Sequence, residues 1–452
     1  MEFRGMETLA IELLRTPEIQ RLRKIRQLGL CHLVFPGAEH SRLAHCLGAA
    51  WIAVLFGRQL IDSTRGFLVP NLLPSVDSIR DLAVAALCHD IGHGPLSHAW
   101  EREIIGESYD FDGWSKKLGL STTARHQLTG ARWHELVTFA FLTWPDGQLH
   151  RFLEQGEAHS SERIAHMLRG RYYLSYLPRL LSSDVDVDRA DFIRRDTYQT
   201  GVAYGRYDLE WLISTCTVGK NDTGELVLGF DARKAHRVIE QFLIARQALY
   251  DTVYYHKTVH CAEGMVGLFL RRLRDVVQEG GRVPAENMLQ PYINAMKREA
   301  LDQEEILRLD DFSLFVLIDA IASSAAIDAT ASDLGKRLLA RDLFKQVPCS
   351  TAQIDDFLSQ KDGYQILADV IKPFCRGNPD YYYLVDKGSF SMFHLNKAGQ
   401  SYLVNPDRTA VPLKDHDGFK NHHKETSRFT RLFTLSEAVK AVSDCLTSHA
   451  RH

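Results

Sequence analysis

The spacing of apolar residues across the first 270 positions constrains the fold of this chain most strongly. Apolar side chains recur three and four positions apart, which places them on one face of an α-helix. Thr16 is followed by Pro17, and proline is favoured at the first position of a helix. The pattern predicts helices over 16–30, 45–61, 78–92 and 133–144, and therefore a mainly α fold.

Strand patterns are concentrated near the C-terminus. The segments YYYLVDKGSFSMFHLN and QSYLVN alternate β-formers with turn residues, which predicts a small antiparallel sheet, and ELVLGF at 225–230 is the best earlier strand. We predict a helical core over 1–270 with a polar insertion at about 106–126. A helical arm over 271–370 and a small α+β region over 371–452 complete the expected organisation.

The composition narrows the class of protein. The chain has 452 residues, of which 45% are hydrophobic and 25% charged, and this argues against a disordered or fibrous protein. The eight cysteines form no CxxC pair, which favours buried thiols in a reducing cytosol. We see no signal peptide and no apolar stretch of membrane-spanning length, so we expect a cytoplasmic protein with no membrane partner. The net charge of −3 gives no indication of nucleic-acid binding, although local basic patches remain possible.

Histidines beside acidic residues are the most informative chemical feature. His89 and Asp90 adjoin at the end of an apolar helical segment, where a nitrogen and a carboxylate reach one point. A further His and Asp from other helices would complete a set of four ligands. Such mixed ligands suit one divalent Mn, Fe, Zn, Mg or Ni ion and leave positions for water or phosphate oxygens. The helix ends at Gly92, Gly94 and Pro95. The chain turns there, which brings His93 and His98 back over the same site.

Each of these pieces also has an ordinary explanation. A single His-Asp dipeptide usually arises by chance, and a His near a helix end is usually a cap or a surface residue. The segment DVDVD at 184–188 is also compatible with a calcium-binding loop or with no ligand at all. The combination, at separations that suit distant helices of one bundle, favours a metal site.

Four segments in order carry a resemblance to a known family. The segment TPEIQRLRKIRQLGLCHLVFPGAEHSRLAHCLG, followed by LCHDIGHGPLSH, DVDRADFIRRD and YYHK, resembles the HD-domain deoxynucleoside triphosphate triphosphohydrolases. That family contains bacterial dGTPases and the mammalian SAM-and-HD-domain restriction factor. The resemblance covers Thr16 to Lys257 and is specific for the family but not for the substrate base. It implies an HD-domain helical bundle that hydrolyses a dNTP to a deoxynucleoside and inorganic tripolyphosphate.

The resemblance also implies a role for individual residues of this chain. It implies four metal ligands: His45, His89, Asp90 and Asp188. It implies that three arginines hold phosphate oxygens: Arg42, Arg189 and Arg246. His98 is the implied proton donor, surrounded by the acid–base group of His93, His134 and Glu135. The residues implied to enclose the deoxyribose are Gln27, Leu28, Asp196, Tyr250 and Tyr254.

Several positions depart from the family pattern or concern regulation. Gln20 and Arg23 match an activating-nucleotide site, but Arg15 stands where an acidic residue typically reads guanine. Because a guanidinium cannot accept a hydrogen bond, another effector or none is expected instead of a guanine nucleotide. Arg189 replaces a frequent Lys, and Phe192 replaces a frequent phosphate-contacting Tyr. Weaker matches to a second nucleotide pocket between subunits favour a homo-oligomer: Val34, Phe35, His256 and Lys257.

Two other functions remain open from the sequence. One is a different HD phosphohydrolase, such as a nucleotidase or a cyclic-nucleotide or alarmone hydrolase, which comparison of dNTP with NTP turnover would distinguish. The other is a nucleotide-sensing or nucleic-acid-binding subunit with an inactive HD site, which would bind DNA or RNA in a salt-dependent way without turnover. The sequence does not indicate the base, the metal or the effector.

Overall fold

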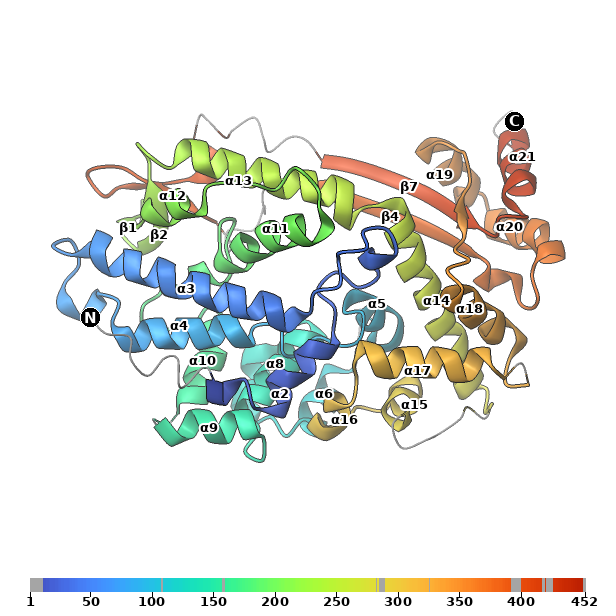
Figure 1. The fold of residues 1–452 in the computed structure, drawn as a ribbon, viewed down its shortest axis with the longest axis horizontal. Coiled ribbons are helices and arrows are strands. Elements are labelled where there is room, and N and C mark those ends of the chain that lie inside the picture. Colours follow the sequence, from blue (N-terminus) through green and yellow to red (C-terminus); the bar gives the residue numbers. More distant parts are fainter. Residues whose placement is uncertain are drawn as a thin grey trace.

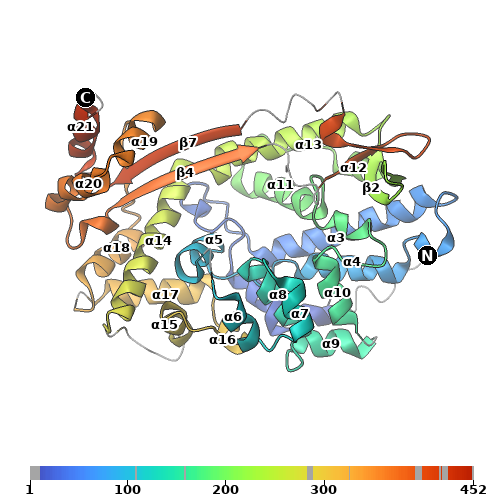
Figure 2. The ribbon, with the colours of Figure 1, turned by 180° about the vertical axis from the view of Figure 1, so that it is seen from behind.

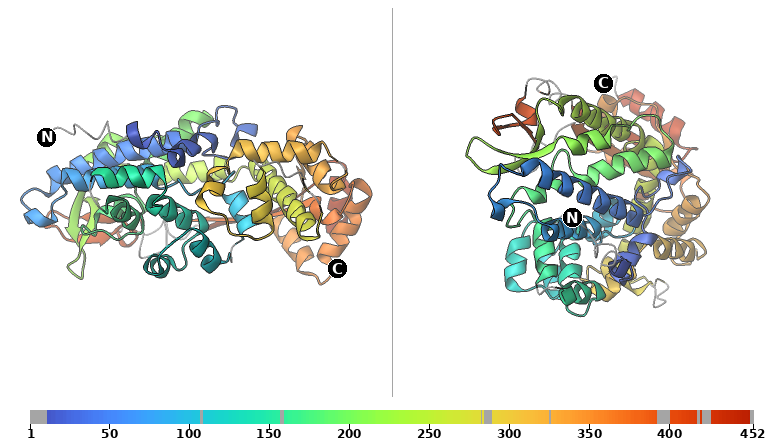
Figure 3. Two further views of the ribbon diagram at one scale, coloured as in Figure 1. Left: turned by 90° about the horizontal axis from the view of Figure 1, so that it is seen from below. Right: turned by 60° about the vertical axis from the view of Figure 1, so that its left-hand side comes forward.

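The fold is a bundle of helices with two small sheets, seen in a computed structural model (Figure 1). The structure describes residues 11–106, 109–156, 159–281, 283, 289–324, 326–391, 400–416, 419 and 426–449. Helices α3 and α4 and strands β1 and β2 lie at one end of the long axis, and helices α19, α20 and α21 lie at the other (Figures 1 and 3). The expected mainly α fold class is confirmed.

The core is formed by long helices that pack through apolar faces. Helix α3 (Arg42–Thr64) packs against α4 (Val76–Cys88) and α11 (Val187–Thr200), and α8 (Trp133–Thr143) packs against α10 (Ser160–Leu168). These helices bury their Leu, Ile, Val and Phe side chains in one continuous hydrophobic core. The removal of this apolar surface from water is the main force that holds the helices together.

Local signals set the ends of the helices that matter most for the site. Ser75 and Ser78 form a reciprocal capping box at the start of α4. Asp186 caps α11 by accepting a hydrogen bond from the backbone N–H of Arg189. Gly201, in the left-handed conformation with φ of 74°, ends α11. Local chemistry therefore fixes the start of α4 and both ends of α11.

The remaining elements surround this core. The described residues include π-helical turns at Glu101–Ile105 and Tyr250–Tyr254, and short 3₁₀ turns near the N-terminus at Arg21–Lys24 and Cys31–Leu33. The other helices are α2 (Pro17–Gln20), α5 (His98–Trp100), α6 (Phe111–Lys117), α7 (Thr122–Leu128), α9 (Gln148–Gly156), α12 (Leu209–Ser214), α13 (His236–Leu249), α14 (Lys257–Gln278), α15 (Gln290–Met296), α16 (Gln303–Leu307), α17 (Asp311–Ala322), α18 (Ala329–Leu339), α19 (Thr351–Ser359), α20 (Gly363–Ile371) and α21 (Val439–His449).

The two sheets correct the expectation of one antiparallel sheet near the C-terminus. Strand β4 (Tyr383–Ser391) pairs with β7 (Thr426–Thr434), which also pairs with β3 (Lys345–Gln346). The segment QSYLVN forms β5 (Tyr402–Val404) in the other sheet. There it runs parallel to β2 (Leu226–Asp231) and antiparallel to β6 (Ala410–Pro412), and β1 (Cys216–Lys220) pairs with the other edge of β2. Residues 392–396 of the first segment lie outside the described residues.

One further expectation differs from the structure, and two positions of the expected domain division can be located in it. The helix expected over 16–30 is only α2 and one 3₁₀ turn, because Ile25 is extended and the chain turns back there. The polar insertion at 106–126 contains α6 and most of α7, each capped by a side chain, Asp110 and Ser121. The boundary expected near 270 falls inside α14, which is continuous from 257 to 278. The division into three regions stays a prediction.

Helix α3 also meets a simple test for a membrane-spanning segment. Among the described residues it is the one helix long and apolar enough to cross a membrane by length and composition. Half of its most apolar window is buried inside the protein, and it carries the buried polar residues Arg42 and His45. These contacts identify α3 as a central helix of the folded core.

Candidate metal centre

A large cavity opens between the helical core and the β4–β7 sheet. Its volume is about 1320 Å³. Residues that directly follow α4 and residues of α8 and α11 form one side, and residues of α14 and β4 form another. Figure 2 shows α14 running beneath β4, on the far side of the molecule from α4. The cavity therefore joins parts of the chain that are about 300 residues apart in sequence, from His89 to Asp386.

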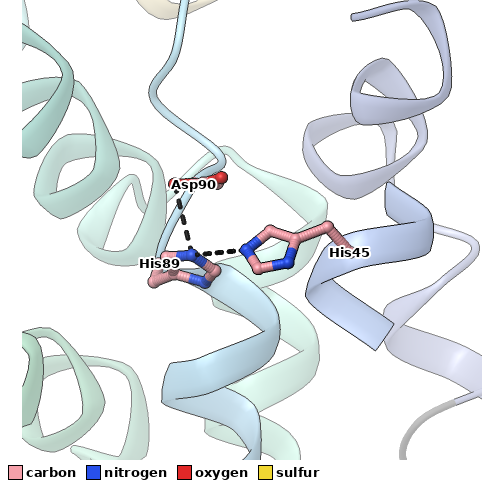
Figure 4. A group of neighbouring side chains, drawn as sticks. All are labelled: His45, His89 and Asp90. Carbon is pink, nitrogen blue, oxygen red and sulfur yellow. Dashed lines mark hydrogen bonds and ion pairs between the residues drawn. The ribbon is translucent and has the colours of Figure 1, made fainter. Parts of the chain in front are cut away.

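Four predicted metal ligands meet at one end of this cavity. His45 Nε2 lies 3.0 Å from Asp188 Oδ1 and 3.3 Å from His89 Nε2. His89 Nε2 in turn lies 3.3 Å from Asp90 Oδ1 and 3.5 Å from Asp188 Oδ1. Figure 4 shows His45 of α3 pointing toward His89 and Asp90 at the end of α4. Three separate helical segments thus bring their nitrogen and oxygen atoms to a common centre.

The separations between these atoms fit one small divalent cation. Ligand atoms that lie about 2.1 Å from a metal are about 3.0 Å apart in octahedral geometry and about 3.4 Å apart in tetrahedral geometry. The four closest donor pairs are 3.0–3.5 Å apart and match this range, and His45, His89 and Asp90 lie together within 4.8 Å. Two imidazoles and two carboxylates also form a donor set that suits several divalent metals. The residues fit a metal ion, but they do not select its identity.

Hydrogen bonds on the far side of each imidazole orient the two histidines. His45 Nδ1 lies 2.8 Å from Asp191 Oδ2, and Asp191 is held by both the Nε and the Nη2 of Arg195, at 2.7 and 2.8 Å. His89 Nδ1 lies 2.7 Å from the carbonyl oxygen of Ala86. These partners take the Nδ1–H of each ring and leave Nε2 to face the centre, as metal-ligating histidines require.

The charges at this centre are strongly coupled. Burial alone would lower the pKa of His45, but hydrogen bonds to Asp188 and Asp191 outweigh it and raise the pKa to about 10. Burial alone would raise the pKa of Asp90, but His89 and Arg42 hold that pKa well below its usual range. Two carboxylates therefore attract positive charge to this point. A divalent cation would take the place of the protons on the imidazoles.

A second group of side chains lies next to the metal centre. The rings of His93 and His134 are stacked 4.2 Å apart, and His93 Nε2 is 3.4 Å from Asp90 Oδ1. Glu101 accepts from both rings, at 3.2 Å from His93 Nδ1 and 2.8 Å from His134 Nδ1. Burial alone would raise the pKa of Glu101, but the two histidines hold it far below its usual value. Glu101 thereby fixes both predicted acid–base histidines with their Nδ1 atoms turned away from Asp90.

Two other members of the predicted acid–base group differ from this arrangement. Glu135 lines the cavity, but its carboxylate is 2.7 Å from Arg169 Nη1 and accepts from the backbone N–H of Arg132 at 3.2 Å. Its contacts are therefore those of a helix cap and an ion pair. His98 begins α5, and its side chain lies outside the described residues. The catalytic role of each stays a prediction.

Two of the three predicted phosphate-binding arginines line the cavity beside the metal centre. Arg42 is buried, donates to Asp90, and lies 2.7 and 3.1 Å from Ser97 Oγ. Arg189 donates to Asp186 and to the carbonyl oxygen of Ser183 at 2.8 Å. Arg246 is also buried, but it is not among the residues that line the cavity and lies 5.6 Å from the centre of the Tyr250 ring. The structure brings Arg42 and Arg189 to the site and places Arg246 behind its wall.

The predicted sugar-binding residues form a continuous stretch of the cavity wall. Asp196 receives hydrogen bonds from Tyr254 Oη at 2.6 Å and lies 2.8 Å from His40 Nε2. The side-chain oxygen of Gln27 is buried without a hydrogen-bond partner among the described residues. Leu28 and Tyr250 complete this stretch, and the ring centres of Tyr250 and Tyr254 are 4.9 Å apart. An acceptor left without a partner is a position that a ligand hydroxyl can satisfy.

The predicted regulatory residues occupy two separate groups outside the cavity. Gln20 accepts from Arg23 Nε at 2.9 Å, and Arg15 pairs with Glu12 at 3.0 Å on the exposed surface. Phe35 contacts His256 edge to face at 5.7 Å, near Val34 and the exposed Lys257 at the start of α14. None of these seven residues lines the cavity. Their regulatory role stays a prediction.

The structure adds functional residues that the sequence did not single out. Glu101, Asp191 and His40 each hold a predicted site residue in place through a short hydrogen bond. A signal existed for Asp191, because it stands three positions after Asp188 on the same helix and so faces the same side. Glu101 and His40 carried no such signal, since their partners come from other segments.

Comparisons with known proteins agree with this geometry. No protein-family model matches the chain. The uncharacterised protein YwfO of Bacillus subtilis is 27% identical over 423 residues, which cover 93% of this chain and 84% of YwfO. Human deoxynucleoside triphosphate triphosphohydrolase SAMHD1 is 25% identical over 349 residues, which cover 76% of this chain. The matched region is only 53% of human SAMHD1, so the chain spans about half of that relative.

A solved structure gives the same architecture. A phosphohydrolase from Bacteroides thetaiotaomicron matches with a TM-score of 0.70 at 21% identity, covering 94% of both chains. This likeness establishes the fold. Over most of its length the chain is therefore homologous to YwfO and to the SAMHD1 triphosphohydrolases, and its fold and His–Asp cluster are those of an HD-type phosphohydrolase.

Proposed function

We propose that the protein hydrolyses deoxynucleoside triphosphates to a deoxynucleoside and inorganic tripolyphosphate, with one divalent metal held by His45, His89, Asp90 and Asp188. One observation carries the proposal: the donor atoms of these four side chains converge within 3.0–3.5 Å of their neighbours at the end of a cavity large enough for a nucleotide. The homology to SAMHD1 triphosphohydrolases supports the choice of substrate class.

The cationic groups around this centre suit a triphosphate. The barrier to attack on a polyphosphate is mainly electrostatic, so positive groups around the reacting phosphorus lower it. When bound, a divalent cation supplies a Lewis acid for a phosphate oxygen. Arg42 and Arg189 already stand beside the metal centre, paired with Asp90 and Asp186. Their forked guanidinium groups can share these carboxylates with phosphate oxygens.

Proton transfer falls to the histidines next to the centre. Departure of the deoxynucleoside breaks the bond between the α-phosphorus and the 5′-oxygen, and that oxygen needs a proton. His98, which opens α5 after the Gly-Pro turn, is the proposed donor, as imidazole titrates near neutral pH. His93 and His134, held by Glu101, position the attacking water and accept its proton.

The opposite part of the cavity wall suits a deoxyribose. Asp196 is fixed by Tyr254 and His40, so one carboxylate faces the cavity in a set orientation. It and the unpartnered amide oxygen of Gln27 are the proposed acceptors for the 3′-hydroxyl. In this proposal the ring of Tyr254 stacks under the sugar and leaves no room for a 2′-hydroxyl, which favours dNTPs over NTPs.

A product assay tests this function directly. The purified protein is incubated with each of four dNTPs and four NTPs in the presence of Mn, Mg, Fe, Zn or Ni, and the products are separated by ion exchange. We expect tripolyphosphate and a deoxynucleoside from dNTPs. Pyrophosphate with dNMP would contradict cleavage at the 5′-oxygen, and equal turnover of NTPs would contradict the role of Tyr254.

A pair of variants ties the activity to the metal centre. His89→Ala combined with Asp90→Ala removes two ligands, so we expect turnover to fall below detection. His126→Ala changes an exposed histidine of α7 and serves as the matched control. Activity that persists in the double variant would place the reaction elsewhere in the protein.

We also propose that a nucleotide effector binds near Gln20 and Arg23 and that the protein assembles into a homo-oligomer. Arg15 beside this group argues against a guanine nucleotide, because it cannot accept a hydrogen bond. The test measures activity and molecular mass after incubation with each NTP and dNTP. Strong activation by GTP would contradict the interpretation of Arg15, and a single mass under every condition would contradict assembly.

A further inference from the structure

The cavity continues well past the sugar-binding stretch, into a region bounded by α14 and β4. His260, Glu263, Gly264 and Arg271 face it from α14 at spacings of three, one and seven, which keep them on one side of the helix. Asp386 of β4 closes the region by accepting from His260 Nδ1 at 2.8 Å. The proposed function uses none of these groups, although they line the same cavity.

Helix α11 gives the direction from the metal centre to this region. Asp188, Phe192 and Asp196 all line the cavity and stand one helical turn apart. Eight residues of helix span about 12 Å, so the wall leads from the metal ligand Asp188 to the sugar-binding Asp196. A nucleotide with its phosphates at the first and its deoxyribose at the second places its base beyond Asp196.

Glu263 is a charged group of the cavity wall that lies beside the loop carrying Gln27 and Gly29. Cys31, Asp196 and Glu263 all line the same cavity. The Oε1 atom of Glu263 is 2.8 Å from where a Cβ on Gly29 would stand, two residues after Gln27. The carboxylate therefore lies against the same loop that encloses the sugar.

The hydrogen-bonding capacity of Glu263 is mostly unused within the protein. Burial raises its pKa, while the charges of His260 and Arg102 and a backbone hydrogen bond from Leu30 act against that rise. Across the described part of the chain, Glu263 has no ion pair within 4.0 Å. Glu263 lines the cavity, and a carboxylate offers about four acceptor positions, so positions remain with which a ligand can hydrogen-bond.

We propose that Glu263 reads the Watson–Crick edge of the substrate base and makes the enzyme prefer guanine over thymine. This inference rests on the proposed dNTP hydrolysis. Guanine presents two adjacent donors, N1–H and the 2-amino group, which match the two oxygens of a carboxylate. Thymine presents one N–H between two carbonyl oxygens, and those oxygens would face the negative carboxylate.

The experiment compares three nucleotides on three proteins. We would measure kcat/KM for dGTP, dITP and dTTP with the wild type, Glu263→Gln and the control Glu279→Gln. dITP lacks only the 2-amino group, and Glu279 is an exposed glutamate just after the last residue of α14. We expect the wild type and the control to favour dGTP over dTTP by about tenfold or more, with dITP between them. In Glu263→Gln we expect the ratio of kcat/KM for dGTP to kcat/KM for dITP to fall toward one.

A measurement of nucleotide binding tests the role of Glu263 independently of whether the protein hydrolyses the nucleotide. Calorimetric titration of the wild type with the same three nucleotides in EDTA reports base preference without the metal, and thermal unfolding checks that Glu263→Gln is folded. Equal kcat/KM for the three nucleotides, or an unchanged ratio in a folded Glu263→Gln, overturns the inference while the proposed function stands. Tighter binding of dGTP without hydrolysis of any dNTP overturns the proposed function and supports the role of Glu263. Failure to bind any of the three in EDTA, together with no turnover of any dNTP when metal is present, overturns both.

Discussion

The two ends of the cavity are built from different kinds of contact. At the metal end, His45, His89, Asp90 and Asp188 lie within 3.5 Å of their neighbours, and every imidazole is held from behind by a second acceptor. At the α14 end, Glu263 has one backbone partner and much unused capacity. The first arrangement is dense and fixes positions closely, whereas the second leaves room for a ligand to supply contacts.

This difference separates the chemistry of the site from its selectivity. Catalysis on a phosphate requires groups held within a fraction of an ångström of their working positions, and a dense network provides that. Selection among bases requires acceptors and donors that remain free until a base arrives, because an edge is read by the hydrogen bonds it makes. Substitutions at the two ends should therefore change different quantities.

The largest expected effect comes from removing a carboxylate at the metal end. Asp188→Ala takes away an oxygen that lies 3.0 Å from His45 Nε2 and 3.5 Å from His89 Nε2. We expect bound metal, measured by atomic emission after dialysis, to fall from about one per chain to none, and turnover to fall below detection. Asp386→Ala removes a carboxylate at the other end and should keep its metal. Equal metal loss in both variants would mean that the two ends are not independent.

A smaller effect is expected from Asp191, which touches the centre only through His45. Asp191→Asn keeps the size of the side chain but weakens its acceptance from His45 Nδ1 and its double contact with Arg195. Such supporting groups typically contribute about 10–100-fold to metal affinity or activity. Competition with a fluorescent chelator measures the affinity. An unchanged affinity would show that His45 is oriented by packing alone.

Two glutamates lie next to the metal centre, but only one of them positions the acid–base histidines, so their variants distinguish positioning of the histidines from mere closeness to the metal. Glu101 holds both His93 and His134, whereas Glu135 is paired with Arg169. We expect Glu101→Gln to lower kcat by about 10–100-fold, since misplaced acid–base groups lose most of their effect, with bound metal unchanged. Glu135→Gln should lower it by only about threefold, as partly exposed ion pairs contribute little. The reverse order would restore Glu135 to the acid–base role implied by the sequence.

The sequence predicted the metal end far better than the rest of the molecule. His89 and Asp90 are adjacent, so a local pattern was enough to propose them, and the family resemblance singled out Asp188 within its compact acidic motif. Glu101 was missed because its bond to His134 joins segments 33 residues apart, and no local spacing encodes that contact. The pairing of β5 with β2 was missed for the same reason, because strand partners are chosen by long-range packing. Glu263 belongs to no motif, and only the fold places it in the cavity.

The smallest expected effect concerns the loop that carries Gly29 at the α14 end. Gly29 has φ of +49°, so Gly29→Ala strains the backbone, and its new Cβ would stand 2.8 Å from Glu263 Oε1. Gly66→Ala is the matched control, because Gly66 has φ of +75° and nothing within 4 Å of a Cβ. We expect urea unfolding to show that the free energy of unfolding falls by a similar amount, about 1–2 kcal/mol, in both variants. Both place an alanine in the left-handed conformation, and the Glu263 side chain can rotate away from the new Cβ. Only Gly29→Ala should then weaken the preference for dGTP over dTTP, because it moves the carboxylate that reads the base. If both variants keep the preference, the position of Glu263 does not decide which base is bound, and selectivity at the α14 end arises from other groups on that wall.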